Sequence, residues 1–146
     1  EPEYYRQYIG DADVKIVFGK TYPLLSHSDA ALVTSGTATL ETSLFRVPQV
    51  VCYHIAAGKL ASFVFRHFFH TKYISLVNLI AGREVVQELF GARFSYNQIH
   101  DELGRVLNDP AYRNRMLDGY DGIIRQLGKP GASRRTAELI YQSLKH

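Results

Sequence analysis

The sequence predicts an α/β fold in which helices cover both faces of a parallel sheet. Short apolar runs of strand character at residues 14–18, 30–34 and 49–53 alternate with segments of helical character. This alternation is typical of βαβ units, which build a parallel sheet. The composition agrees with a globular chain, because 46% of the 146 residues are hydrophobic and 21% are charged.

The first part of the chain is expected to contain short elements. Tyrosines at helical spacing predict a helix at the N-terminal end, and β-branched residues at 14–18 predict the first strand. In a parallel sheet, ligands gather at the edge where the strands end. The elements expected before residue 95 are helices at 2–8, 22–27, 37–45 and 83–90, strands at 14–18, 30–34, 49–53 and 73–76, and a turn at 78–82.

Residues 57–70 form an amphipathic, basic and aromatic-rich segment. At helical period, Leu60, Val64 and Phe68 fall on one side, and Lys59 and Arg66 fall on the other. Such a helix can lie on an anionic membrane surface. It can equally be a core helix with one solvated face, so the pattern leaves both interpretations open.

The chain becomes helical after residue 94. Ser95 and the pair Asp109-Pro110 are strong helix starts, and Ser133 begins a last helix after the break at 128–131. We therefore expect a sheet-containing core over residues 1–94 and a helical part of the same domain over residues 95–146. The helical part has no clustered catalytic residue types, and it would serve as scaffold or as a partner surface.

The turn between the second strand and its helix is the strongest candidate for a ligand site. A strand, a small-residue turn and a helix point backbone N–H groups at an anion, and Gly36 lets a phosphate approach closely. Ser35 and Thr37 add hydroxyl donors, and Glu41 lies one helical turn after Thr37. Glu41 could accept both hydroxyls of a ribose. The alternative is that Ser35 or Thr37 caps the helix and Glu41 is a solvated helix residue.

Other sequence features exclude several classes of protein. Gly19-Lys20-Thr21 imitates the end of a phosphate-binding P-loop, but Val14 stands where that motif requires glycine. No group of His, Cys, Asp and Glu has metal-ligand spacing, and the net charge of +3 does not by itself indicate nucleic-acid binding. The single cysteine, Cys52, cannot form an internal disulfide and agrees with a reducing cytosol. No apolar run is long enough to span a membrane.

Three segments carry a resemblance to a known family. The sequences at 28–41 and 47–53, followed by Tyr-Ile-Ser-Leu-Val-Asn-Leu-Ile-Ala-Gly-Arg-Glu at 73–84, resemble lipid-A-disaccharide synthases. These are inverting glycosyltransferases with two Rossmann-like halves, the GT-B architecture. The resemblance covers most of the chain and corresponds to the C-terminal, nucleotide-sugar-binding half. Because the chain opens with Glu1-Pro2 and no initiator Met, we expect it to be a piece of a longer protein.

The resemblance implies a reaction and a set of binding residues. UDP-2,3-diacylglucosamine would donate its sugar to 2,3-diacylglucosamine 1-phosphate in lipid A biosynthesis of Gram-negative bacteria, without a metal or other cofactor. The UDP-sugar would bind at Ser35, Gly36, Thr37, Glu41, Asn78 and Gly19, although Asn78 could instead only tie down its own turn. The catalytic base would belong to the missing N-terminal half, so this chain should bind nucleotide without catalysing the transfer.

The resemblance also implies partners and a location. It predicts the missing N-terminal half and the lipid acceptor as partners, a peripheral position at the cytoplasmic face of the inner membrane, and no nucleic acid. It further implies a homodimer that exchanges C-terminal segments. Two alternatives remain, namely another GT-B nucleotide-sugar enzyme, such as a transferase or an epimerase, and a non-enzymatic Rossmann-like binding module. Another GT-B enzyme would not be expected to carry Asn-Leu-Ile-Ala-Gly-Arg-Glu. A further domain upstream of this chain would exclude the binding module.

Overall fold

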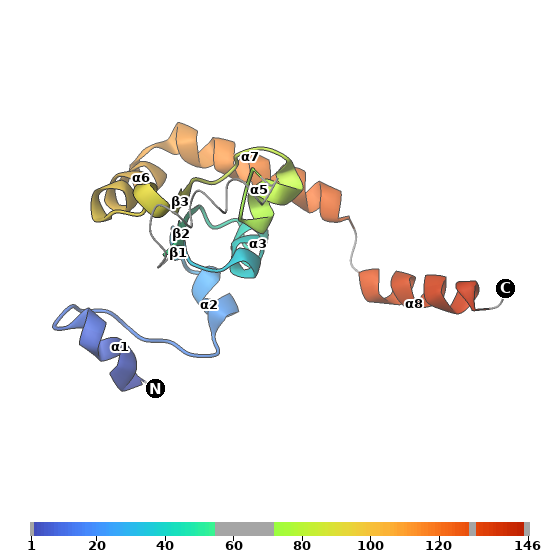
Figure 1. The fold of residues 1–146 in the computed structure, drawn as a ribbon, viewed down its shortest axis with the longest axis horizontal. Helices are drawn as coiled ribbons and strands as arrows, with labels where there is room; N and C mark the ends of the chain where they lie inside the picture. Colours follow the sequence, from blue (N-terminus) through green and yellow to red (C-terminus); the bar gives the residue numbers. More distant parts are fainter. Residues whose placement is uncertain (1, 55–71, 129–130, 145–146) are drawn as a thin grey trace.

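In the part of the chain that the structure describes, three parallel strands form the sheet (Figure 1). The computed structural model describes residues 2–54, 72–128 and 131–144, so the segment predicted as an amphipathic helix at 57–70 lies outside the described residues. Strand β2 (Gln49–Tyr53) lies between β1 (Ala31–Val33) and β3 (Glu88–Phe90), with Val33 opposite Val51 and Cys52 opposite Leu89. The predicted parallel sheet is confirmed, and the carboxyl ends of its strands meet at one edge.

Helices cover both faces of the sheet, as predicted. Val50, Val51 and Cys52 are all nearly completely buried, although successive side chains of a strand point to opposite faces. Helix α3 (Gly36–Leu44) and helix α6 (Tyr96–Asn108) both contact β2 and lie on opposite sides of the strands in Figure 1. Helix α7 (Pro110–Leu127) packs against α3, α6 and α5 (Leu76–Ala81) and closes the core.

Helix α3 packs into the core through small polar residues. Thr39, Thr42 and Ser43 are almost fully buried, and each hydroxyl donates to a backbone carbonyl three or four residues earlier in the same helix. Because these hydroxyls are satisfied within the helix, their burial leaves no unpaired polar group. The helix can therefore lie close to the sheet without a large apolar side chain in between.

The predicted starts of the C-terminal helices are confirmed. Ser95 Oγ accepts the Gln98 N–H at 3.3 Å at the start of α6, and Asp109 Oδ1 accepts the Tyr112 N–H at 2.9 Å at the start of α7. The last helix, α8 (Ala132–Ser143), begins one residue before the predicted Ser133. Side-chain caps are local signals, which is why the sequence places these boundaries well.

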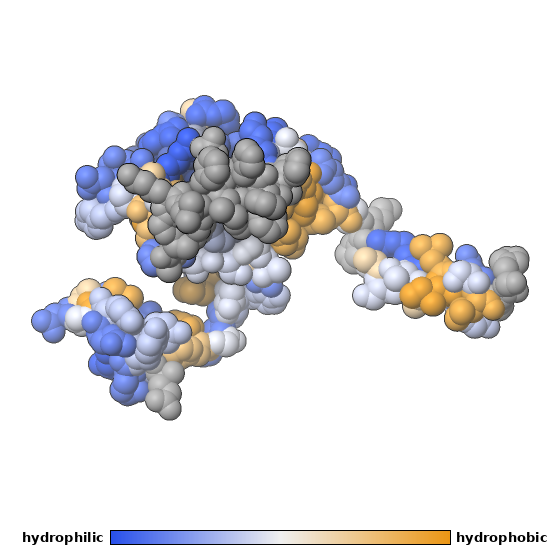
Figure 2. Space-filling view, in the orientation of Figure 1, coloured by the Kyte–Doolittle hydropathy of each residue, from blue (hydrophilic) through white to orange (hydrophobic). Residues whose placement is uncertain are grey.

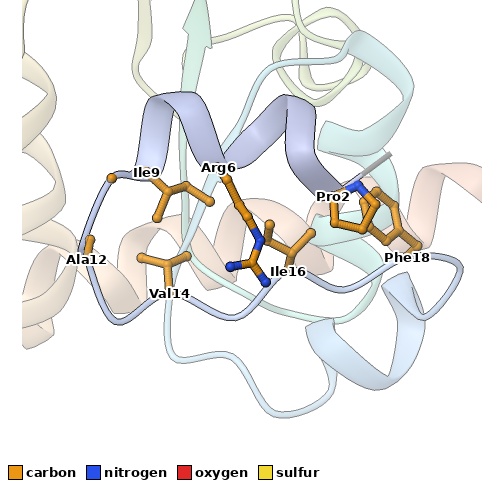
Figure 3. A pocket seen from close by; sticks show the side chains of 8 residues that line it. Pro2, Arg6, Ile9, Ala12, Val14, Ile16 and Phe18 are labelled. Atoms are coloured by element: carbon orange, nitrogen blue, oxygen red, sulfur yellow. The ribbon is translucent and has the colours of Figure 1, made fainter.

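The predicted strand at 14–18 is wrong. These residues have no regular secondary structure, and Val14, Val17 and Phe18 are exposed. A strand requires a hydrogen-bonding neighbour, and β1 pairs only with β2 in the described part of the chain. The segment instead runs beside helix α1 (Pro2–Ile9), where the two enclose a cavity of about 370 Å³ (Figure 3).

The elements predicted between residues 73 and 90 are also wrong. Ser75 caps α5 instead of lying in a strand, and the predicted turn at 78–82 is the body and C-terminal cap of that helix, with Gly82 at φ 64°. Strand β3 lies where a helix was predicted to end. The reason is a long-range polar contact, because the Glu88 carboxylate binds the backbone of residues 74 and 75 and anchors this segment to the sheet.

One glycine of α7 marks a close approach to the chain before β3. A Cβ on Gly119 would overlap Val85 Cγ1 and lie 3.1 Å from Val85 Cγ2. We expect Gly119→Ala to lower the free energy of unfolding by about 1–3 kcal/mol, because it overpacks the core. Gly122→Ala on the same helix meets nothing closer than an Arg125 nitrogen at 3.9 Å and should be neutral or stabilising. Urea denaturation of both variants checks this, and equal stabilities would contradict it.

Helix α8 carries a surface that no other described element covers. None of its residues is buried, and Leu139, Ile140 and the C-cap residue Leu144 are all more than half exposed. Figure 2 shows these apolar residues as an orange face along the helix, which extends away from the sheet.

Helix α2 (Thr21–Leu25) completes the fold and leads into β1. In the described part of the chain, no helix is long and apolar enough to cross a membrane.

Candidate functional site

The turn at residues 35–37 lies at the edge where the parallel strands end. The chain leaves β1 at Val33, stays extended through Ser35, at φ −128° and ψ 138°, and enters α3 at Gly36. The Ser35 carbonyl already accepts the Thr39 N–H at 3.2 Å, as the first hydrogen bond of the helix. This is the strand, turn and helix arrangement that the sequence predicts.

The first N–H groups of α3 are open at this turn. N–H groups in the first turn of a helix have no acceptor within the helix, and the Ser35 side chain does not cap them. Instead, Ser35 Oγ lies 3.3 Å from Thr37 Oγ1, so the two exposed hydroxyls form a pair in front of the helix. The structure therefore does not support the interpretation that the Ser35 side chain caps α3. The remaining N–H groups and hydroxyls suit an anion.

Glu41 follows on the same helix, one turn after Thr37. Its side chain is partly buried and makes no hydrogen bond or ion pair with any residue in the described ranges. A carboxylate that is partly desolvated and has no internal partner can accept two hydroxyl groups from outside. The structure therefore brings Ser35, Gly36, Thr37 and Glu41 together on one helix.

Tyr53 ends the neighbouring strand β2 at the same edge, and His54 follows it. The Tyr53 hydroxyl oxygen is buried, and it lies 3.9 Å from the position that a Cβ on Gly36 would occupy. Burial, followed by the negative charge of Glu88, raises the pKa of the Tyr53 phenol above its ordinary value. The His54 ring packs edge-on against Phe94, with 5.4 Å between centroids. We did not predict Tyr53, although its position at a strand end is a signal that could have found it.

Asn78 is completely buried, and the protein itself uses both ends of its side-chain amide. Its Oδ1 accepts the N–H groups of Val85 and Val86 at 2.7 and 3.0 Å. Its Nδ2 donates to the Val86 carbonyl and to Glu88 Oε1, both at 2.9 Å. These contacts agree with the structural alternative for Asn78. Its predicted role in sugar binding stays a prediction.

Glu88 is the centre of this buried network, and we did not predict it. Its carboxylate accepts the backbone N–H groups of Ile74 and Ser75, the Ser75 hydroxyl at 2.7 Å and the Asn78 amide. A buried carboxylate is tolerated only when its oxygens are hydrogen-bonded, and here several donors converge on it. The network joins α5 to β3 and holds the segment before α5 in place.

Gly19 does not follow a strand, contrary to the prediction. It is exposed on the segment before α2, with φ 65°, and nothing lies within 4 Å of the position of a Cβ. This positive φ suits glycine. A contact between Gly19 and a nucleotide stays a prediction, and the described residues give it no support. Among the same residues, no group of three His, Cys, Asp or Glu side chains is placed to hold a metal ion.

The sheet is parallel, helices cover both of its faces, and α3 begins without a side-chain cap at the carboxyl edge. These features place this protein among Rossmann-like α/β domains. The sequence model of lipid-A-disaccharide synthetase matches residues 5–140. The chain belongs to this family, as its motifs predict.

Curated relatives agree with this family assignment. The chain is 37% identical over 129 residues to lipid-A-disaccharide synthase of Myxococcus xanthus and 34% identical over 132 residues to that of Syntrophus aciditrophicus. It is 38% identical over 128 residues to the enzyme of Anaeromyxobacter dehalogenans. These matches cover 88%, 90% and 88% of this chain. They cover only 33%, 34% and 33% of the relatives, so the chain spans about a third of their length.

Proposed function

We propose that this chain is the donor-binding part of a lipid-A-disaccharide synthase, and that it binds UDP-2,3-diacylglucosamine. The whole enzyme would transfer the diacylglucosamine to 2,3-diacylglucosamine 1-phosphate with inversion at the anomeric carbon. The observation that carries the proposal is the uncapped start of α3 at the carboxyl edge of a parallel sheet. Membership of the family supports the proposal that the anion at that helix start is the diphosphate of a UDP-sugar.

The proposed roles follow from the chemistry of each group. The N–H groups at the start of α3, with the hydroxyls of Ser35 and Thr37, bind the diphosphate and stabilise the negative charge that develops as it leaves. Glu41 accepts the ribose hydroxyls. The base that activates the acceptor hydroxyl would be supplied by the N-terminal half of the enzyme, so this chain alone binds nucleotide without turnover.

The proposed roles of Asn78 and Gly19 differ from those of the turn. Asn78 would act on the substrate through the position of α5, since its own amide is already hydrogen-bonded. Gly19 would contribute only backbone groups to the nucleotide, and its exposed position makes it the weaker candidate. The chain is expected to work at the cytoplasmic face of the inner membrane, where its lipid substrates reside.

Calorimetric titration of the 146-residue chain with UDP and ADP tests the proposed function. UDP should bind more tightly than ADP. Glu41→Ala should weaken UDP binding by about 1.5–3 kcal/mol for each charge-assisted hydrogen bond lost. Glu138→Ala, which alters a carboxylate on the distant helix α8, is the control and should bind UDP normally. Equal affinity in the parent chain and in Glu41→Ala would contradict the ribose assignment.

The apolar face of α8 supports the proposal of a homodimer. Leu139, Ile140 and Leu144 would be covered by a second copy, because exchange of an end helix is a low-cost route to a symmetric dimer. Light scattering coupled to size exclusion should give a dimer for the intact chain. A chain ending at Gly128 should be monomeric, or should aggregate through the uncovered surface of its partner helices. A folded truncated chain with the oligomeric state of the parent would show that α8 does not hold two copies of the chain together.

A further inference from the structure

The Tyr53 hydroxyl is a buried polar group without a partner. Its oxygen is inaccessible to solvent and forms no hydrogen bond with any residue in the described ranges. Nearly all buried polar groups in native proteins are hydrogen-bonded, because an unpaired one retains its full desolvation cost. An unpaired hydroxyl at the edge where the strands end therefore requires a specific explanation.

Among the described residues, hydrogen-bond donors lie near this hydroxyl but no acceptor is within reach of it. Its oxygen lies over Gly36, the first residue of α3, where the N–H groups of the first helical turn point outward. The Ser35 carbonyl is already engaged by the Thr39 N–H. Among the described residues, the phenol proton therefore has no acceptor. An oxygen anion from outside would satisfy both the phenol and the N–H groups.

The protonation state of Tyr53 fits a donor. Burial raises the pKa of the phenol, and the charge of Glu88 raises it further, so the hydroxyl keeps its proton at neutral pH. Tyr53 Oη lies 3.9 Å from the position of a Cβ on Gly36, so the hydroxyl and the first N–H groups of α3 are close enough to bind oxygens of the same diphosphate. The position of the Tyr53 hydroxyl and its protonation state thus both suit a hydrogen-bond donor to an anion.

We propose that the Tyr53 hydroxyl is a further ligand-binding group, which donates a hydrogen bond to the diphosphate of a nucleoside-diphosphate sugar held at residues 35–37. The inference rests on the proposed function, since it adds a donor from β2 to the donors of α3. The diphosphate would then be bound between two adjacent strand ends. A phenol donor aimed at the departing diphosphate also stabilises the charge that forms on it.

The test is Tyr53→Phe in the 146-residue chain, with UDP and uridine as probes. UDP affinity should fall about tenfold or more, as expected for the loss of one hydrogen bond to a charged group. Uridine, which has no phosphate, should bind the variant and the parent equally in an NMR titration. The stability of the ligand-free variant to urea should be equal to or higher than that of the parent, because the change removes an unpaired buried hydroxyl.

Tyr112→Phe is the matched control, because the Tyr112 hydroxyl already donates to Glu102 on α6. That variant should lose stability and keep its affinity for UDP. Equal UDP affinity in Tyr53→Phe and the parent would overturn the inference while leaving the proposed function intact. A loss of stability in ligand-free Tyr53→Phe would also overturn it, since the hydroxyl would then have a partner in the protein. A parent chain that does not bind UDP would refute the proposed function itself.

Discussion

Replacing Gly36 with valine should abolish UDP binding while the fold survives. The backbone at Gly36 is helical, and a Cβ there would meet nothing closer than the Tyr53 hydroxyl at 3.9 Å, so a side chain can start at this position without overlap. The two methyl groups of valine would occupy the space through which a phosphate reaches the N–H groups of α3. Losing two charge-assisted hydrogen bonds costs about 3 kcal/mol or more, which is at least about a hundredfold in affinity.

The measurement is calorimetric titration with UDP, accompanied by circular dichroism to confirm the fold. Gly104→Val is the matched control, because Gly104 also lies in a helix and a Cβ there meets nothing within 4 Å. This control should bind UDP as the parent does. Normal UDP binding by Gly36→Val would mean that the diphosphate lies elsewhere.

Replacing Asn78 with alanine should cause the largest loss of stability. The change leaves the buried N–H groups of Val85 and Val86 without their acceptor and removes one donor from the Glu88 carboxylate. Each unsatisfied buried group costs about 1–3 kcal/mol, so the free energy of unfolding should fall by about 3 kcal/mol or more. Urea denaturation followed by circular dichroism measures this change.

Asn114→Ala provides the comparison, since Asn114 is exposed on α7 and should tolerate alanine within about 0.5 kcal/mol. UDP affinity then separates the two roles considered for Asn78. A structural role predicts lower stability, with nucleotide affinity retained by the folded fraction. Unchanged stability together with lost UDP affinity would instead establish a direct contact with the substrate.

The parts of the fold that depend on local sequence could be predicted. Ser95 and Asp109 cap helices through contacts to residues three positions away, and the sequence alone identifies both. The turn at 35–37 is likewise encoded within one short segment. The predicted strand at 14–18 was wrong for a different reason. Its β-branched residues have a high strand propensity, but a strand also needs a neighbouring strand to pair with.

The long-range contacts of the site were beyond prediction. Glu88 and Asn78 are ten residues apart and meet because the chain turns back between α5 and β3, which brings the two side chains into hydrogen-bond contact. Tyr53 reaches the start of α3 because β1 and β2 are adjacent and parallel, so that their ends coincide. The family resemblance suggested candidate binding residues, but it did not distinguish a side chain that binds substrate from one that positions a helix.

Cys52 can serve as a chemical probe of the central strand, β2. It is the single cysteine of the chain, it lies on β2 with 4% of its surface exposed, and burial raises the pKa of its thiol. A thiol that is buried and protonated is inert toward alkylating reagents until the surrounding structure opens. The rate at which Cys52 is alkylated therefore reports how often the middle of the sheet opens, without any engineered label. A ligand that binds the carboxyl edge of that strand would slow this reaction in proportion to its occupancy.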